Sequence, residues 1–232
     1  MDLNSVILIG FYVLILIYSI IVHEVSHGFV ALWLGDATAK YSGRLNFNPI
    51  SHIDIWGSII VPLAMLVTTG FAFGWAKPVP YNPYNLRNQK WGPAMVAFGG
   101  PASNIVIALV SAVLAKFIMV PVAVKAAIIT GISNASWSQI SATVSGSFGS
   151  IFFALLMIVI FWNVLLAFFN LIPFPPLDGS KLLFSVFPIR TGTMAMLEQY
   201  GFILLLLFII VFSGPLGFFL TKMLSIFYGI AI

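Results

Sequence analysis

The 232-residue sequence has very little charge: only 7% of its residues are Asp, Glu, Lys or Arg, whereas 61% are hydrophobic. A typical soluble domain carries roughly 25% charged residues. So few charges cannot cover the surface of a water-soluble protein of this length. The composition therefore argues against a soluble enzyme, a disordered chain and a nucleic-acid-binding protein, and it predicts a membrane protein.

The sequence also has no cysteine and only three histidines. The absence of cysteine excludes disulfides, iron–sulfur clusters, thiolate metal sites and cysteine nucleophiles. Any metal chemistry must therefore use the few histidines and the six acidic residues.

Long apolar stretches predict the fold, because a helix needs roughly 20 apolar residues to cross a bilayer. We expect an all-α polytopic membrane protein that forms a single domain over residues 1–232, with about 4–6 transmembrane helices. The longest polar stretch, Ser133 to Ser147, is expected to be a loop. The core helices are predicted over about 5–34, 93–120 and 148–170, and a C-terminal helical hairpin over about 197–232.

One apolar segment is interrupted by glycines and by Pro62, which favours a re-entrant or β-hairpin-like membrane loop over about 55–81. Lys and Arg in short loops stay on the cytoplasmic side. Re-entry would place the basic residues before and after this segment together in the cytoplasm and the N-terminus outside. The residues predicted to be cytoplasmic are Lys40, Arg44, Lys77, Arg87, Lys90, Lys181 and Arg190, whereas Lys116 and Lys125 fall on the opposite side.

The first apolar segment contains His23-Glu24-Val25-Ser26-His27. Residues four apart lie on one face of a helix, so the two imidazoles can bind one Zn²⁺, with Glu24 beside them to activate a water molecule. Ionisable groups inside a membrane segment cost at least ~2.5 kcal/mol each, which indicates a function. The alternative is a polar cluster between helices or an interfacial anchor.

A hydrolytic zinc site usually has a third protein ligand. Asp178 is the best candidate, because it follows a membrane segment and the proline-rich run that begins at Asn170. Prolines fix extended geometry and can direct a carboxylate back toward the helices. The alternative is that Asp178 is no metal ligand and only caps a helix after a proline-rich turn.

Two asparagines lie near the expected cytoplasmic level of this site. Asn104 follows Gly99-Gly100-Pro101 in the third segment, and Asn170 ends the fourth segment. Each amide could donate a hydrogen bond to a developing oxyanion or to the backbone of a substrate. Each could equally hold helices together.

Two loop residues complete the candidates. His52 could be a further metal ligand, a residue behind a ligand, or an ordinary loop residue. Trp75 to Tyr81 is an extended-type run that could pair with a substrate strand. Val79 has the N–H between Pro78 and Pro80, so we expect that N–H to be free and to anchor the substrate. The alternative is an interfacial loop.

Together these motifs resemble the site-2 protease family of intramembrane zinc metalloproteases, in its compact prokaryotic form without a PDZ or other appended domain. The resemblance implies that His23, His27 and Asp178 bind one Zn²⁺ per chain and that Glu24 is the general base of a zinc-dependent endopeptidase. The motifs that carry it are His23-Glu24-x-x-His27, Gly35-Asp36-x-Thr38-Ala39-Lys40, Asn48-Pro49-x-x-His52, Gly74 to Pro80, Gly100-Pro101-x-x-Asn104, Asn170-x-x-Pro173 and Leu177-Asp178-Gly179.

The resemblance also implies partners and a location. The family cuts transmembrane segments, so single-pass membrane proteins or signal-peptide remnants in the lipid bilayer are the expected substrates, with no nucleic acid. The protein would be a multi-pass protein of the cell membrane with its active site toward the cytoplasm. The competing interpretation is a membrane metal-ion transporter or a metal-binding scaffold. A transporter would spread its ligands along a pathway, and a scaffold would not need Glu24.

The predicted topology can be tested directly, because no native cysteine has to be removed. Single cysteines introduced near positions 44 and 87 are expected to react with a membrane-impermeant thiol reagent from the same, cytoplasmic side. Labelling of the two positions from opposite sides would contradict re-entry.

Overall fold

The computed structural model describes residues 2–69, 74–187, 189 and 191–232. Part of the predicted re-entrant segment, residues 70–73, and the predicted cytoplasmic Arg190 lie outside this description. Within it the regular elements are all helices and no β-strand occurs. The α-helices are α1 (Leu3–Trp33), α2 (Thr38–Tyr41), α3 (Pro49–His52), α4 (Val61–Thr69), α5 (Gly92–Lys116), α6 (Val122–Ser133), α7 (Trp137–Val144), α8 (Phe148–Asn170), α9 (Asp178–Val186), α10 (Thr191–Val211) and α11 (Ser213–Ala231); η1 (Ile55–Ile60) is a π-helix and η2 (Pro83–Asn85) a 3₁₀-helix.

Four of these helices, α1, α5, α8 and α11, are long and apolar enough to cross a membrane. This confirms the predicted all-α polytopic class, and the three core helices begin and end close to the predicted residues. Many large apolar side chains on these helices are exposed in the structure, such as Phe11, Val106 and Phe218. Lipid tails would cover them, because patches of this kind are rare on soluble monomers.

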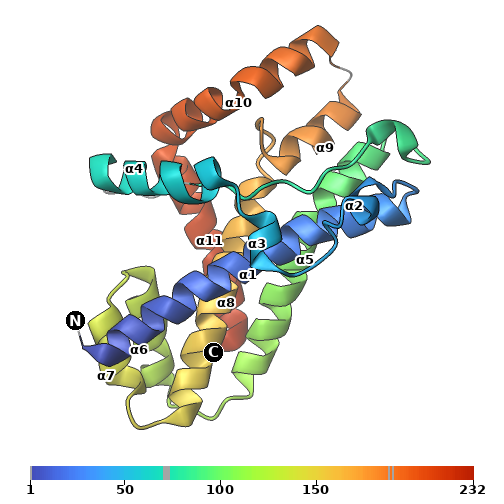
Figure 1. Cartoon of the computed structure of the whole chain (residues 1–232). Coiled ribbons are helices and arrows are strands. Elements are labelled where there is room, and N and C mark those ends of the chain that lie inside the picture. Colours follow the sequence, from blue (N-terminus) through green and yellow to red (C-terminus); the bar gives the residue numbers. More distant parts are fainter. Residues whose placement is uncertain (1, 70–73, 188, 190) are drawn as a thin grey trace.

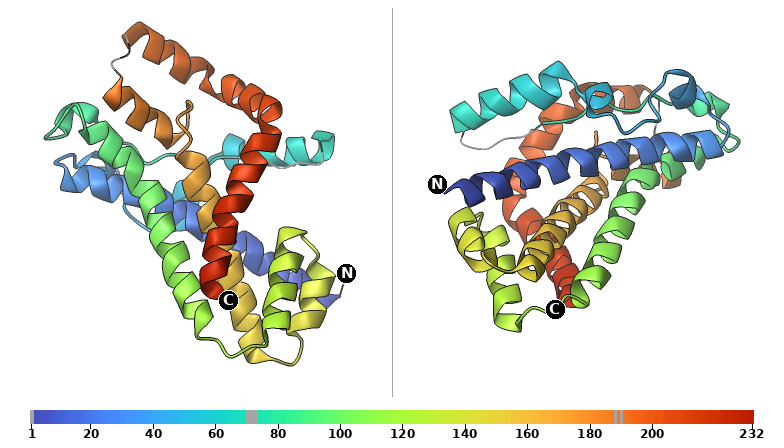
Figure 2. Two further views of the ribbon diagram at one scale, coloured as in Figure 1. Left: turned by 180° about the vertical axis from the view of Figure 1, so that it is seen from behind. Right: turned by 60° about the horizontal axis from the view of Figure 1, so that its bottom comes forward.

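The four helices form one packed body (Figures 1 and 2). Helices α5 and α8 pack along each other, α11 packs against both, and α1 crosses them obliquely. The main apolar core lies between them and includes Phe153, Met157 and Ile160, which are fully buried. Since α1 runs the whole width of the body, its second half reaches the end at which most of the loops gather.

The expectation that Ser133 to Ser147 is only a loop is wrong. This stretch contains α7, which packs on α6 and on the first half of α1 near the N-terminus (Figure 1). Its residues Ile140 and Val144 are buried, and the Trp137 ring packs on Tyr12 with 4.8 Å between ring centroids. Apolar residues three and four apart on one helical face explain this packing. The many serines between them conceal it in the sequence.

Helix α6 also explains why Lys125 breaks the expected pattern of basic loops. This lysine is 4% exposed, and its ammonium group donates hydrogen bonds to the carbonyls of Ala115 and Ala231. These carbonyls lie at the carboxyl ends of α5 and α11, where a cation is favourable. Lys125 therefore caps two helices inside the protein and carries no information about the orientation of a loop.

The segment from Ile55 leaves the body as a helix and returns beside its own beginning. Helices η1 and α4 run outward, and the returning chain then donates from Trp75 N–H to Gly57 O at 3.0 Å and from Lys77 N–H to His52 O at 2.9 Å. An excursion that starts and ends at one place has the shape required of a re-entrant loop. Its outgoing part is helical, however, so the β-hairpin-like form is wrong, because η1 and α4 satisfy their backbone groups internally.

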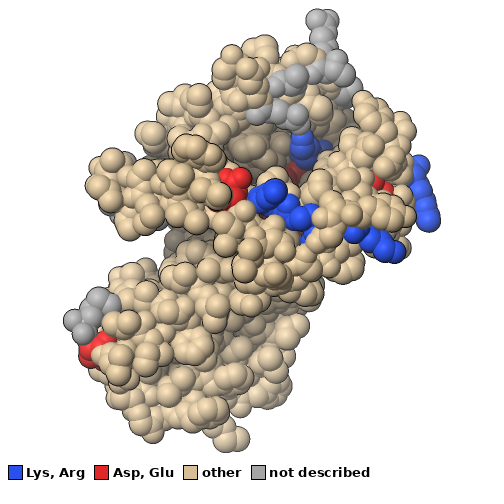
Figure 3. Space-filling view, in the orientation of Figure 1, with Lys and Arg blue, Asp and Glu red and all other residues tan. Residues whose placement is uncertain are grey.

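The basic residues around this segment gather at one end of the molecule. Arg44 donates to Lys77 O at 2.7 Å, and the N–H of Arg87 donates to Leu34 O at 2.9 Å. Figure 3 shows Lys and Arg as a band across the upper part of one face, with the part below it nearly free of charge. The two basic clusters are thus neighbours, as the predicted topology requires.

The C-terminal residues form two helices that meet at Phe212, but they do not pack along their lengths as a hairpin would. Helix α10 extends away from the N-terminal end of α11 and lies over the region of α9 (Figures 1 and 2). Its Phe202 ring packs on Trp75 with a centroid distance of 5.1 Å. Helix α10 therefore packs against the returning part of the re-entrant segment.

Candidate metal centre

Two histidines of α1 and one aspartate of α9 converge on one point. The Nε2 atoms of His23 and His27 lie 3.1 Å and 3.2 Å from Oδ2 of Asp178. The three atoms all lie within 4.8 Å of one another, and within the described residues this is the one group of its kind. Ligands about 2.0–2.1 Å from a tetrahedral Zn²⁺ are separated by about 3.3 Å. The separations of 3.1 Å and 3.2 Å from Asp178 Oδ2 are close to this value.

The hydrogen bonds of the two imidazoles leave both Nε2 atoms available as ligands. His27 Nδ1 lies 2.7 Å from the carbonyl oxygen of Val96, which can only accept, so Nδ1 carries the proton. The N–H of Gly100 is farther from the same nitrogen, at 3.3 Å. His23 Nδ1 lies 2.5 Å from Oδ1 of Asn104. Fixing the proton on Nδ1 in this way is the usual arrangement behind a metal-binding histidine.

Asp178 reaches the histidines because the chain turns sharply after α8. Asp178 is the first residue of α9, and a Cβ at the next residue, Gly179, would collide with the carbonyl oxygens of Leu171 and Ile172. Glycine there lets α9 begin directly against the end of α8. The sequence prediction that the proline-rich run directs Asp178 toward the histidines agrees with this geometry.

The charge state of Asp178 also suits a metal ligand. Burial raises the pKa of its carboxyl group, but the two adjacent imidazoles lower it more, to about 2. The group is therefore a carboxylate at neutral pH. A deprotonated carboxylate and two imidazoles with free Nε2 atoms form a donor set that Zn²⁺ accepts.

Gly100 of α5 leaves the space that the two imidazoles occupy. A Cβ at this position would lie closer to the Nε2 atoms of His23 and His27 than nonbonded atoms can approach. At this crossing, α5 provides a flat backbone surface behind the ligand atoms.

Glu24 lies between the two histidines on α1, and its carboxylate has a partner that sequence reasoning did not find. Its Oε2 accepts a hydrogen bond from the N–H of Val79 at 3.0 Å. The prediction that the Val79 N–H is free is therefore wrong, because the partly buried carboxylate takes this donor. The surrounding segment is nonetheless extended, since alternate residues, Trp75, Lys77 and Val79, bond inward.

The two asparagines have different surroundings. Asn104 is fully buried, and its amide protons are directed to Ser19 O and to Asn163 Oδ1, so it does not offer them to a substrate. Its position corrects the predicted oxyanion role, because burial requires the amide to bond inward. Asn170 is half-buried and donates one proton to Leu166 O in its own helix. Its place beside the turn to Asp178 keeps the predicted substrate role as a proposal.

His52 does not belong to the metal group. It is 2% exposed, and its Nε2 lies 2.8 Å from Asn46 O, while its backbone carbonyl accepts from Lys77. Of the three alternatives, the structure supports a loop residue that holds the returning part of the re-entrant segment.

Asn163 of α8 was not singled out from the sequence. It is 1% exposed and bonds to Asn104, two steps from the metal ligands. A signal was present, because Asn163 is an amide within the apolar stretch from Phe148 to Phe169, and polar residues inside the membrane are commonly functional.

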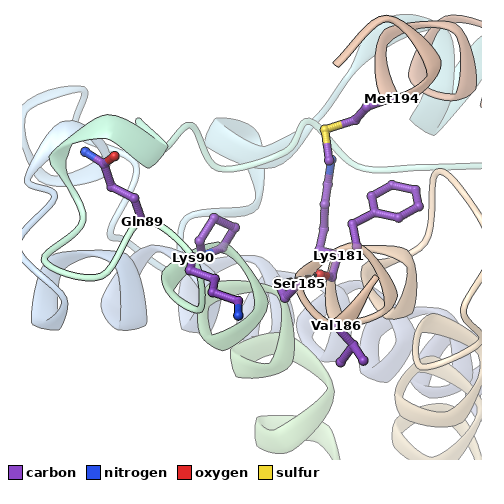
Figure 4. Close-up of a pocket in the computed structure, with 8 residues that line it drawn as sticks. Gln89, Lys90, Lys181, Ser185, Val186 and Met194 are labelled. Atoms are coloured by element: carbon purple, nitrogen blue, oxygen red, sulfur yellow. Dashed lines mark hydrogen bonds between the residues drawn. The ribbon is translucent and has the colours of Figure 1, made fainter. Parts of the chain in front are cut away.

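A separate pocket of about 460 Å³ lies between the start of α5 and α9 (Figure 4). Its lining includes Gln89, Lys90, Lys181, Phe184 and Met194 and none of the three metal-group residues. Figure 4 shows the side chains of Lys90 and Lys181 directed apart, so the two cations do not converge on one anion. The pocket is therefore distinct from the metal centre.

Comparison with known proteins agrees with this geometry. The model of the family described as Peptidase family M50 matches residues 11–214. The chain is 34% identical over 212 residues to YwhC of Bacillus subtilis (strain 168), which is named as a zinc metalloprotease, covering 90% of this chain and 83% of the relative. It is 23% identical over 206 residues to Rip2 of Mycolicibacterium smegmatis, also named as a zinc metalloprotease. This match covers 87% of this chain and 68% of the relative. No solved structure matches the chain.

The space at Gly100 gives a testable prediction. In Gly100→Ala the added methyl group displaces the imidazoles, so zinc binding should weaken roughly 10–100-fold, the range seen when the surroundings of metal ligands change. Gly99→Ala is the matched control, since its Cβ would contact Val30 and Ser26 and no ligand atom. Zinc affinity of the purified proteins, measured against a competing chelator, checks this. Equal affinities of the two variants would contradict the assigned site.

Proposed function

The chain belongs to peptidase family M50, the site-2 proteases, and on that basis we propose that this metalloprotease cuts transmembrane segments of other membrane proteins, at the cytoplasmic side of the cell membrane. The observation that carries the proposal is the convergence of His23, His27 and Asp178 next to Glu24. These groups lie at the end of the molecule where the basic loops gather. We infer that the three residues hold one zinc ion and that Glu24 is the general base.

The reaction is hydrolysis of a peptide bond. Zinc, when bound, supplies positive charge that polarises the scissile carbonyl and eases deprotonation of a water molecule. Glu24 takes a proton from the attacking water molecule as the oxygen of that water bonds to the carbonyl carbon. Glu24 then gives this proton to the departing amine nitrogen as the carbon–nitrogen bond breaks. Among the described residues, the other carboxylate grouped with the histidines is that of Asp178, which is engaged by the two imidazoles.

A transmembrane substrate also needs hydrogen-bond partners where its helix unwinds. In a helix each carbonyl is bonded within the helix, and lipid supplies no replacement. The extended chain from Trp75 to Val79 contacts Glu24 through the N–H of Val79 and could pair with an unwound substrate. We propose that a substrate carbonyl replaces Glu24 as the acceptor of the Val79 N–H. Glu24 is thereby released to act on water.

The substrates proposed are single-pass membrane proteins, in regulated intramembrane proteolysis, or signal-peptide remnants. A transporter is the less suitable alternative, since the described residues bring together one metal group and no series of such groups. A scaffold would not need a carboxylate at Glu24, because an amide oxygen could equally accept from the N–H of Val79. These considerations favour proteolysis, and a cleavage assay decides between the classes.

The role of Glu24 is tested by Glu24→Gln. Glutamine keeps an oxygen that can accept from Val79 but cannot take a proton from water, so zinc content should stay unchanged while cleavage falls about 10²–10⁴-fold. The assay co-reconstitutes the purified protein with candidate single-pass substrates in liposomes and follows cleavage on gels. Near-normal turnover by the zinc-loaded variant would show that another group is the base.

The role of Val79 is tested by removing its N–H. Val79→Pro should raise KM about tenfold, since one hydrogen bond to the substrate is lost, while zinc content stays unchanged. Val79→Ala keeps the N–H and should have nearly normal KM and kcat. If kcat falls in Val79→Pro while KM stays constant, the N–H serves Glu24 alone and substrate is not held by strand pairing.

A further inference from the structure

A buried polar network lies behind the metal centre and joins three membrane helices. It consists of Ser19 and His23 of α1, Asn104 of α5 and Asn163 of α8, and none of these residues is more than 5% exposed. Polar groups in such apolar surroundings are costly unless they are hydrogen-bonded. The direction of each hydrogen bond is therefore a strong constraint on its neighbours.

The donor and the acceptor of each hydrogen bond in this network can be assigned by starting from Asn163. Its Nδ2 donates to the backbone carbonyl of Val159 at 2.9 Å and to Ser19 Oγ at 2.9 Å. A backbone carbonyl can only accept, so the NH₂ group of Asn163 must face Val159. This leaves Oδ1 of Asn163 facing Asn104, and it accepts from Asn104 Nδ2 at 2.7 Å. The orientation of one amide thus determines the orientation of the next.

Asn104 passes this direction on to His23. The second proton of its Nδ2 is directed to Ser19 O at 3.3 Å, so its Oδ1 is the atom that faces His23 Nδ1. A rotated Asn104 amide would place its oxygen against two acceptors and its NH₂ against the imidazole. His23 would then carry its proton on Nε2, which is the nitrogen that a metal ion needs free.

We propose that Asn163, supported by Ser19, is a positioning residue of the metal centre. It fixes the orientation of Asn104 and so keeps the proton of His23 on Nδ1 and the lone pair of Nε2 directed at the metal. This inference rests on the proposed function, because it takes His23 as a zinc ligand. The competing role is purely structural: the network would only hold α1, α5 and α8 together.

The first test compares the zinc affinity of purified variants by competition with a chelator, alongside their thermal unfolding midpoints. Asn163→Leu removes the acceptor for Asn104 and should weaken zinc binding roughly 10–100-fold. Trp162→Phe is the matched control. It deletes the neighbouring hydrogen bond between α8 and α1, from Trp162 Nε1 to Tyr12 O at 3.0 Å, and should lower the unfolding midpoint with unchanged zinc affinity.

The second test asks whether Asn163 acts through the orientation of Asn104. In Asn104→Asp both side-chain oxygens are acceptors, so an acceptor faces His23 Nδ1 in either orientation. The second carboxylate oxygen then faces Ser19 O and Asn163 Oδ1, so adding Asn163→Leu to this background removes one unfavourable acceptor and should cause no further loss of zinc affinity. The coupling between the two positions separates positioning from helix packing, because lost packing would weaken binding in both backgrounds.

The outcomes are decisive in each case. Wild-type zinc affinity in Asn163→Leu, or an equal loss in the Asn104→Asp background, would overturn the proposal. If Asn163→Leu does not fold, Ser19→Ala takes its place as the smaller truncation, with an expected loss of roughly threefold that disappears in the Asn104→Asp background. Unchanged affinity in Ser19→Ala would then overturn it. Wild-type protein that binds no zinc would instead refute the proposed function itself.

Discussion

The close crossing of α1 and α5 is the constraint on which the rest of the site depends. At Gly100 the backbone of α5 comes so near to α1 that a Cβ would collide with the imidazoles, and at Gly99 a Cβ would contact Val30 and Ser26. That approach lets His23 and His27 pack against α5 and lets backbone and amide acceptors of α5 reach their Nδ1 atoms. Asp178 of α9 then completes the group, because the chain after α8 folds back at Gly179.

The apolar surroundings make these polar contacts strong and specific. Inside a protein a hydrogen bond is electrostatically stronger than in water, and an unpaired polar group is correspondingly costly. The network from Val159 to His23 satisfies every amide proton of Asn104 and Asn163, which selects one orientation for each. The same reasoning applies to Glu24, whose carboxylate takes the one N–H that lies between two prolines. In the proposed mechanism a substrate carbonyl takes over the Val79 N–H, so the Glu24 carboxylate is released only when substrate is present.

Much of the fold and part of the site follow from the sequence, because local spacing carries them. Helical periodicity places His23 and His27 on one face with Glu24 beside them, and a proline-rich turn directs Asp178 back to them. Contacts between distant residues are not encoded in any local pattern. The partner of Val79 is 55 residues away and that of Asn104 on α8 is 59 residues away. Lys125 resembles a loop residue until the ends of α5 and α11 meet around it.

The central claim, that two imidazoles of α1 and the carboxylate of Asp178 bind one zinc ion, is tested most directly by X-ray absorption spectroscopy of the purified protein at the zinc edge. The account predicts about four nitrogen and oxygen ligands near 2.0–2.1 Å, with the scattering pattern of two imidazoles. In Asp178→Asn the two-imidazole pattern should persist while the shell of oxygen ligands changes. A zinc site with one imidazole or none, or a spectrum that Asp178→Asn leaves unchanged, would contradict it.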